Sequence, residues 1–182
     1  MNKELERLDI AEIQPDLIMR GDDIVPEFGQ AEKLVDAAQL TIGSSSVITA
    51  CGAARLGLKV AFVGLVGEDE FGHFMLDAMQ ERGIDTGACI VDPSAATGMS
   101  VILSGPYDRA ILTYPGTMPL LRVEQIDEAM LQRARHLHLG SYFLLDALRP
   151  GLPGLFSEAR KQGLTTSLDT NWDPSGRWDV AS

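Results

Sequence analysis

The chain has 182 residues, 45% of them hydrophobic and 6% aromatic, with a formal net charge of −11 at neutral pH. This length suits one domain with a sizeable core. The acidic balance excludes the basic face that a nucleic-acid-binding protein needs, but not a nucleotide ligand.

The first part of the chain predicts strands and helices in alternation. The apolar start predicts a strand ending near Glu12 and a turn at residues 14–16. Residues 22–41 resemble a small hairpin, and residues 46–56 a helix that closes at Gly57. The run KVAFVGLVG, residues 59–67, predicts one continuous buried strand. Apolar residues at helical spacing then predict a helix that closes at Gly83.

The second part continues the alternation. Residues 98–116 predict a hairpin joined at residues 105–108. Residues 122–134 predict an amphipathic helix with Val123, Ile126, Ala129 and Met130 on one face. A strand at 136–143, a helix at 151–163 and a strand at 164–171 follow. This order predicts βαβ units and a parallel sheet covered by helices.

Small and polar residues follow the predicted strands. Ligands of open parallel sheets bind at the carboxyl ends of strands, so we expect these residues to form one rim. Carboxylate oxygens accept hydrogen bonds from neighbouring sugar hydroxyls, which suits a polyhydroxylated ligand. The same residue types also suit ordinary turns, and the residues alone leave both interpretations open. The set comprises Asp16, the run 43–46, Gly140, Ser141, Asp169, Asn171 and Asp173.

Several motifs, in order along the chain, resemble the ribokinase-like (PfkB) family of carbohydrate kinases. Gly43-Ser44, Ala54-Arg55-Leu56-Gly57 and Val66-Gly67-Glu68-Asp69-Glu70-Phe71-Gly72 resemble its amino-terminal signature. The stretch AEIQPDL resembles Gly-Glu-x-Asn-x-Asp-Leu, with Asp16 at the sugar-binding Asp. LTYPGT resembles the segment after the family's second hairpin, and LDTNWDPSGRW resembles its Asp-x-Asn-x-Arg region, with the Arg later, at Arg177.

The resemblance implies a fold and a set of site residues. Residues 1–182 would be the amino-terminal portion of one ribokinase-like α/β domain, a doubly wound, mostly parallel sheet with lid segments near 22–41 and 97–114. Small residues would let the backbone approach the sugar, and the lids would pair two subunits in a homodimer. The implied substrate-binding residues are Asp16, Gly43, Ser44, Ser45 and Gly140. Asp169 and Asn171 would lie near the phosphate.

The sequence departs from the family pattern at four points. Ser44 replaces the second Gly, Ile48 replaces a sugar-contacting Asn, and Gln14 replaces an Asn. These changes leave the identity of the sugar open. The Gly-Ala-Gly-Asp motif, which carries the general base and the anion hole, is absent from the sequence. We therefore expect a fragment or natural truncation of a longer kinase, with no catalytic base of its own.

The expected function is ATP-dependent phosphorylation of a sugar or polyol hydroxyl, with Mg²⁺ bridging the phosphates. The alternative is a non-catalytic sugar-binding or interaction remnant. A Rossmann dehydrogenase is excluded, because no Gly-x-Gly-x-x-Gly follows the first strand. A sheet that ends here would leave an exposed apolar edge.

Other residues have structural interpretations. Asp69 is expected to cap a helix, and His136 and His138 to be hydrogen-bonded histidines rather than zinc ligands, so no metal site is expected. Trp172 and Trp178 suit either packing or stacking on a ligand.

Cys51 and Cys89 lack a disulfide or metal spacing and predict buried thiols in a cytoplasmic protein. No apolar run approaches the roughly 20 residues of a transmembrane helix, and the charged start lacks a signal core, so no membrane partner is expected.

Overall fold

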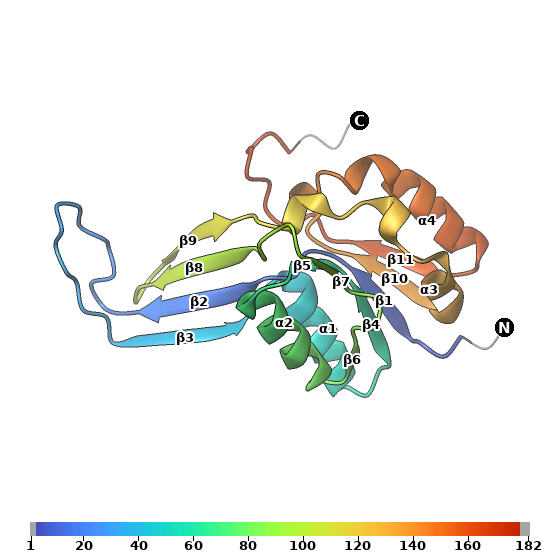
Figure 1. Ribbon diagram of the computed structural model, residues 1–182, viewed down its shortest axis with the longest axis horizontal. Helices are drawn as coiled ribbons and strands as arrows, with labels where there is room; N and C mark the ends of the chain where they lie inside the picture. Colours follow the sequence, from blue (N-terminus) through green and yellow to red (C-terminus); the bar gives the residue numbers. More distant parts are fainter. Residues whose placement is uncertain (1–2, 179–182) are drawn as a thin grey trace.

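The structure, a computed structural model, describes residues 3–178 and combines a parallel sheet with a projecting β lid (Figure 1). The five-stranded sheet has the order β11-β10-β1-β4-β6, and every neighbouring pair is parallel. Its strands are β1 (Arg7–Ile10), β4 (Val60–Val63), β6 (Ile84–Asp85), β10 (His136–Leu139) and β11 (Thr165–Leu168). Two short strands, β5 (Leu65–Gly67) and β7 (Ile90–Asp92), pair beside it.

Helices cover both faces of the parallel sheet (Figure 1). On one face α1 (Ser45–Arg55) and α2 (Glu70–Gln80) pack against β4, with Phe62 and Met75 fully buried. On the other, α3 (Glu128–Arg133) and α4 (Leu152–Lys161) enclose Leu8, Leu137 and Leu139. The sheet is therefore doubly wound, as the alternation of elements predicts. No helix within residues 3–178 is long and apolar enough to cross a lipid bilayer.

Local signals explain the helix boundaries. The Asp69 carboxylate caps α2 by accepting a hydrogen bond from the backbone N–H of Gly72 (2.8 Å), so the expected cap is confirmed. The same carboxylate accepts a second hydrogen bond from Thr97 N (2.7 Å), outside the helix. Gly57 and Gly83, with φ of 92° and 82°, follow α1 and α2 in the left-handed conformation that glycine adopts without strain. Both predicted helix ends are confirmed.

The predicted strand at residues 59–67 is wrong, because the chain divides at Gly64 into β4 and β5. The Val63 carbonyl accepts a hydrogen bond from Ala11 N (3.2 Å), whereas the Gly64 carbonyl accepts one from Ile90 N (2.9 Å). The chain thus changes partner from β1 to β7 within one residue. A Cβ on Gly64 would lie 2.6 Å from Cδ1 of Ile13, so the crossing requires glycine.

The predicted turn at residues 14–16 is also wrong, because Pro15 and Asp16 open strand β2 (Pro15–Arg20). Proline is tolerated as the first residue of a strand. The hairpin expected within residues 22–41 forms instead between β2 and β3 (Ala37–Ile42), across a loop at 21–36. The sequence of residues 22–41 did not show this pairing, because β2, the strand that pairs with β3, lies before the loop and outside that range.

Two further elements are shorter than the sequence predicts. The helix expected at 122–134 splits into a 3₁₀ turn at Val123–Gln125 and α3, because the Asp127 carboxylate caps a new helix start at Ala129 N (2.9 Å). Ala129 is consequently exposed instead of lying on the buried face. The strand expected at 136–143 ends at Leu139, and a 3₁₀ turn follows at Tyr142–Leu144.

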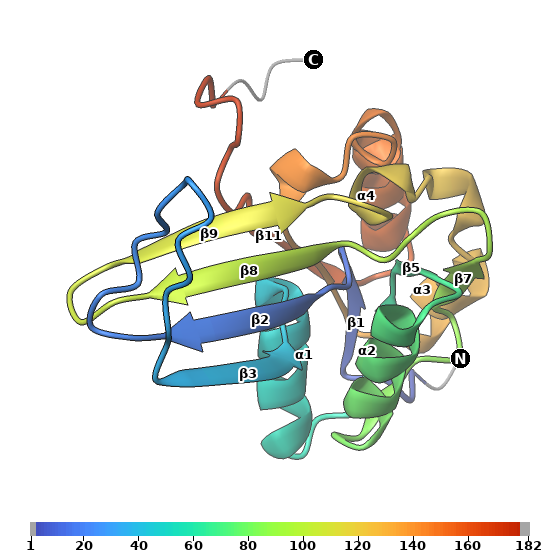
Figure 2. The ribbon, with the colours of Figure 1, turned by 60° about the vertical axis from the view of Figure 1, so that its left-hand side comes forward.

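The lid sheet has the order β3-β2-β8-β9 and includes the predicted hairpin, β8 (Met99–Ser104) and β9 (Arg109–Tyr114) (Figure 2). Because side chains alternate along each strand, the two faces of the lid sheet carry different kinds of residue. The inner face, which lines the cavity described below, includes Asp16, Ser100, Ile102, Ile111 and Thr113. The outer face is apolar throughout its central rows, with Leu17, Met19, Ala38, Leu40, Val101, Leu103, Ala110 and Leu112.

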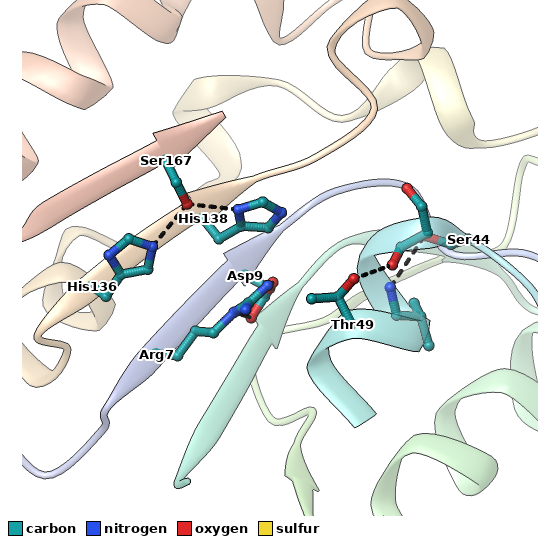
Figure 3. A network of polar contacts seen from close by, with 9 residues as sticks. Arg7, Asp9, Ser44, Thr49, His136, His138 and Ser167 are labelled. Carbon is teal, nitrogen blue, oxygen red and sulfur yellow. Dashed lines mark hydrogen bonds and ion pairs between the residues drawn. The ribbon is translucent and has the colours of Figure 1, made fainter. Parts of the chain in front are cut away.

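A polar network occupies part of one face of the parallel sheet (Figure 3). The Arg7 guanidinium donates two hydrogen bonds to the buried Asp9 carboxylate, at 2.7 and 2.6 Å. His136 and His138 both hydrogen-bond to the Ser167 hydroxyl, at 2.8 and 2.7 Å, so the two histidines have partners as expected. Strand β11 lies at the edge of the sheet and reads Thr-Thr-Ser-Leu. The expected apolar edge is therefore largely polar.

Both cysteines are free and half-buried, which agrees with the absence of a disulfide spacing. The Cys89 thiol donates a hydrogen bond to the Phe62 carbonyl at 3.3 Å. Burial raises the pKa of Cys89 to about 12, so this thiol is unreactive at neutral pH.

Candidate functional site

A cavity of about 1100 Å³ lies between the inner face of the lid sheet and the segments that follow β1, β10 and β11. Its position at the carboxyl ends of parallel strands is where open α/β sheets bind ligands. Seven of its lining residues are charged, with both signs represented. They are Glu12, Asp16, Asp146, Asp173, Arg109, Arg149 and Arg177.

Asp16 and Gly43 are in close contact at the cavity wall. Asp16 is half-buried on β2, and burial raises the pKa of its carboxyl while Arg109 opposes this effect. A Cβ on Gly43 would lie 2.4 Å from Oδ1 of Asp16 and 2.8 Å from the Gln14 carbonyl oxygen. The small residue at position 43 thus lets one element of the protein approach another and leaves room for the Asp16 side chain.

The start of α1 supplies hydroxyl groups to the same cavity. Ser44 has a left-handed backbone (φ 61°), and its hydroxyl caps α1 by accepting a hydrogen bond from Val47 N at 3.3 Å (Figure 3). Ser45 lines the cavity, and its buried hydroxyl has no hydrogen-bond partner within the described residues. Ile48, 52% exposed, places an apolar side chain beside them.

Gly140 lies behind this wall and is not among the residues that line the cavity. A Cβ at this position would lie 1.7 Å from Oγ of Ser46, in the first turn of α1. Glycine therefore lets the end of β10 pass directly beneath the helix. The structure places Gly140 where it supports the serine residues and does not face the ligand space.

The segment after β11 contributes Asn171 but not Asp169 to the cavity lining. Asn171 has a left-handed backbone (φ 54°), and its side-chain amide donates a hydrogen bond to Ser141 Oγ at 3.1 Å. Asp169 is exposed, and its carboxylate accepts a hydrogen bond from Asn171 N at 3.1 Å. The two residues expected near the phosphate are thus adjacent, with only Asn171 turned inward.

Glu12 is a cavity residue that the sequence analysis treated only as the end of a strand. It is 2% exposed, and its Oε1 accepts a hydrogen bond from the Ser141 hydroxyl at 2.8 Å. Oε2 is buried with no partner within the described residues. Burial raises the pKa of Glu12 to about 7, because the hydrogen bonds from Ser141 and Ser44 only partly offset desolvation. An ionisable residue directly after a buried strand was the available signal.

A second buried group involves Gln14, which stands where the family pattern has Asn. Gln14 Nε2 donates to Ser100 Oγ at 3.1 Å, and Ser100 Oγ hydrogen-bonds to Thr113 Oγ1 at 2.9 Å. Gln14 Oε1 has no partner within residues 3–178. Ser100 and Thr113 come from β8 and β9, and Gln14 directly precedes β2, so only the folded lid brings the three together.

Two tryptophans pack together beside the cavity, and Trp172 lines it. Trp178 packs edge-to-face on Phe143, and Trp172 packs edge-to-face on Trp178. Trp172 lines the cavity and is nevertheless 67% exposed. Trp178 therefore packs on other aromatic side chains, one of the two roles that the sequence left open, whereas the geometry of Trp172 suits stacking on a ligand.

The parallel sheet with helices on both faces, the four-stranded lid and the cavity between them define the ribokinase-like class of α/β proteins. The sequence profile of the pfkB family carbohydrate kinase matches residues 15–180. The chain belongs to this family.

Individual relatives are sugar kinases. The chain is 30% identical over 133 residues to fructokinase-2 of Oryza sativa subsp. japonica, covering 71% of this chain and 40% of that protein. It is 33% identical over 140 residues to 5-dehydro-2-deoxygluconokinase of Geobacillus kaustophilus, covering 73% and 41%. The chain thus spans about 40% of the length of these relatives.

Solved structures agree on the fold. The PfkB protein from Polaromonas sp. JS666 superposes with a TM-score of 0.81 at 26% identity, covering 94% of this chain and 57% of that one. A fructokinase from Xylella fastidiosa with bound ATP gives a TM-score of 0.77 at 24% identity, covering 94% and 53%. The expected family and the expected fold are both confirmed.

Proposed function

We propose that this chain supplies the sugar-binding part of an ATP-dependent kinase that phosphorylates a hydroxyl group of a sugar or related polyol. The observation that carries the proposal is the cavity, whose wall holds the half-buried Asp16 carboxylate beside Ser44 and Ser45. Two carboxylate oxygens can accept hydrogen bonds from two neighbouring hydroxyls of one sugar. Family membership supports the same chemistry.

Each predicted site residue has a role in this proposal. Asp16 binds the sugar, Gly43 makes room for the Asp16 side chain, and Ser44 and Ser45 present hydroxyls to the sugar. Gly140 supports the serine residues from behind. Asn171 lies on the phosphate side of the cavity, and Asp169, outside the lining, accepts a hydrogen bond from the Asn171 backbone N–H.

ATP supplies the phosphoryl group, and Mg²⁺ neutralises its charge. No group of three or more His, Cys, Asp or Glu side chains within residues 3–178 could hold a metal ion, so we assign Mg²⁺ to the ATP phosphates. The sequence contains no Gly-Ala-Gly-Asp segment. We therefore propose that the general base and the phosphate-binding amides lie in polypeptide outside these 182 residues.

The relatives suggest two acceptors, fructose and 5-dehydro-2-deoxygluconate. Ile48 in place of a family Asn removes one hydrogen-bonding group from the cavity. Both acceptors carry at least one pair of vicinal hydroxyls that Asp16 could bind, and only one carries a carboxylate. Arg109 and Arg177, which also line the cavity, could pair with that carboxylate.

The test is ADP release, followed in a coupled assay with ATP, Mg²⁺ and each acceptor, on the product of the complete gene. Acceptor-dependent ADP release supports the proposal. If no ADP forms but calorimetry detects sugar binding, the non-catalytic sugar-binding alternative replaces it. If folded protein shows neither, both are wrong.

Two broader features belong to the same proposal. We propose a homodimer through the apolar outer face of the lid sheet, supported by the exposure of Leu40 and Leu112 on that face. A cytoplasmic location is supported by the two free thiols.

A further inference from the structure

Three left-handed residues lie around the buried Glu12 carboxyl. Within residues 3–178 five non-glycine residues have positive φ, and three of them are Ser44 (61°), Ser141 (57°) and Asn171 (54°). They precede α1, follow β10 and follow β11, and so come from three separate parts of the chain. Such a backbone is unfavourable for these residues and persists only where surrounding contacts hold it.

A continuous set of hydrogen bonds joins Glu12 to the rim of the cavity. Ser141 Oγ donates to Glu12 Oε1 at 2.8 Å, and Asn171 Nδ2 donates to Ser141 Oγ at 3.1 Å. Asn171 Oδ1 in turn accepts a hydrogen bond from Trp172 N at 2.7 Å. The buried end of β1 is thus connected, through two left-handed residues, to the exposed indole that lines the cavity.

We propose that Glu12 is a positioning residue, which acts through Ser141 and Asn171 to hold the segment that carries Trp172 beside the ligand space. Neither Glu12 oxygen needs to touch a ligand for this role, since Oε1 is bonded to Ser141 and Oε2 is buried. The consequence for ligand affinity rests on the proposed sugar-binding function. The positioning itself does not.

The ionisation of Glu12 gives the network two states near neutral pH. Its pKa of about 7 means that both forms are populated there. The ionised carboxylate accepts a stronger hydrogen bond from Ser141, and Ser141 polarised in this way accepts a stronger one from Asn171. The environment of Trp172 should therefore follow the charge of Glu12.

Other charged groups face this region from the surrounding elements. Asp169, after β11, raises the pKa of Glu12 further by its negative charge. His138, on β10, has its pKa lowered to about 4 by burial and is neutral above pH 5.5. The start of α1 contributes Ser44, Ser45 and Ile48, which do not titrate in this range. The remaining charged groups line the cavity, namely Asp16, Arg109, Asp146, Arg149, Asp173 and Arg177.

The experiment is ¹⁹F NMR of the whole chain labelled with 5-fluorotryptophan. The sequence has two tryptophans, and Trp178→Phe assigns the Trp172 signal. Between pH 5.5 and 8.5 we expect the Trp172 signal to shift with a single midpoint near 7. In Glu12→Gln, which retains an acceptor for Ser141 but cannot ionise, this titration should disappear. A titration that persists in Glu12→Gln, or none in the unchanged protein, would overturn the inference.

Two further variants make the result specific. Asp9→Asn is the matched control, because Asp9, on β1, is another buried carboxyl, its pKa raised to about 6 by burial, but is paired with Arg7. The Trp172 titration should survive in that variant. Asn171→Gly should also abolish the titration, because glycine adopts the left-handed backbone without strain but lacks the side chain that links Ser141 to Trp172. This variant tests the inference even if Glu12→Gln fails to fold.

Measuring sugar affinity distinguishes a failure of this inference from a failure of the proposed function. Calorimetry with fructose should give several-fold tighter binding at pH 8 than at pH 6, and no such difference in Glu12→Gln. If no sugar binds while the Trp172 signal follows Glu12, the proposed function fails and the positioning role stands. If sugar binds equally at both pH values and Trp172 does not titrate, only the positioning role fails.

Discussion

Individual residues shape the cavity in two ways. Glycines allow close contact between neighbouring helices and strands, and some buried polar atoms have no hydrogen-bond partner in the described residues. Gly43 and Gly140 each lie against a side chain from another element, Asp16 and Ser46 respectively. Gln14 Oε1 and Ser45 Oγ are buried without partners in the described chain. A buried acceptor without a partner is costly, and a ligand that donates hydrogen bonds would relieve that cost.

Asp16→Asn tests the proposed sugar contact, since it retains the shape of the side chain and removes its charge. We expect sugar affinity to fall by about tenfold or more, about 1.4 kcal/mol, because hydrogen bonds to charged groups exceed neutral ones by about this amount. Calorimetric titration measures the effect. Asp77→Asn, on the exposed face of α2, is the control that should bind normally. Equal affinity of Asp16→Asn and wild type would remove Asp16 from the site.

Gly43→Ala and Gly52→Ala form a matched pair near α1. The new Cβ at position 43 would overlap the Asp16 carboxyl and the Gln14 carbonyl, and we expect a loss of about 1–3 kcal/mol in unfolding free energy. At position 52, inside the helix, no atom lies within 4 Å of the new Cβ. That substitution should gain about 0.5–1 kcal/mol. Urea denaturation distinguishes them, and equal effects would contradict the packing described for Gly43.

At the scale of elements, the cavity lies where the inner face of the lid sheet meets the carboxyl ends of β1, β10 and β11 of the parallel sheet. The alternation of residues on β2, β8 and β9 directs polar groups inward and apolar groups outward. In the parallel sheet, Leu8 of β1 and Leu137 and Leu139 of β10 point toward α3 and α4. Arg7, Asp9, His136 and His138 alternate with them along the same strands and lie on the other face, where both histidines meet Ser167 of β11. This polar face makes the stability of the sheet sensitive to pH.

His138 should destabilise the fold in acid. Burial, with a further contribution from Arg7, lowers its pKa from 6.5 to about 4. The unfolded chain therefore binds a proton below pH 6.5 that the folded chain does not bind until near pH 4, so stability is lost as pH falls between these values. Asp9 and Glu12 act in the opposite direction. Their pKa values are raised to about 6 and about 7 by burial, so their contribution is lost as pH rises through those values.

Relative to the unchanged protein, His138→Gln should gain unfolding free energy as the pH falls from 6.5 to 4.5, measured by urea denaturation. Gln can still hydrogen-bond to Ser167 but takes up no proton. An unchanged slope in His138→Gln would show that other groups cause the acid sensitivity.

At the scale of the whole molecule, the lid projects from the body (Figure 1). Apolar side chains on the outer face of its sheet are exposed. Leu112 is 64% exposed and lies in one row with Leu17, Leu40 and Val101. Apolar patches of this kind mark interaction surfaces. A second copy of the chain, using the same face, would cover both patches at once.

Leu112→Lys tests the proposed dimer. We expect the molecular mass in solution to fall from that of two chains to that of one, because a charge would be buried at the centre of the contact. Light scattering after size-exclusion chromatography measures the mass. Leu56→Lys, on an 86% exposed leucine at the end of α1, is the control that should remain dimeric. A monomeric wild-type protein would contradict the dimer directly.

The sequence by itself determined the features that depend on neighbouring residues. Asp69 and Gly83 bound α2 through a cap and a left-handed glycine, and the hairpin at 98–116 follows from a turn signal between alternating strands. The order of these elements was sufficient to predict the doubly wound sheet. The ordered motifs were sufficient to identify the family, and they pointed to Asp16, Ser44, Ser45 and Asn171, which all line the cavity.

Only the tertiary structure decided the rest, because it depends on contacts between residues far apart in the chain. The apolar run 59–67 carries no sign that its partner changes from β1 to β7 at Gly64. Nothing near Glu12 in the sequence shows that Ser141 and Asn171, about 130 and 160 residues later, would surround its carboxyl. Gly140 is a turn residue by sequence, and the space it leaves for Ser46 exists only once α1 packs over β10. Local propensity fixes the elements, whereas their packing fixes which polar groups are buried and left to bind a ligand.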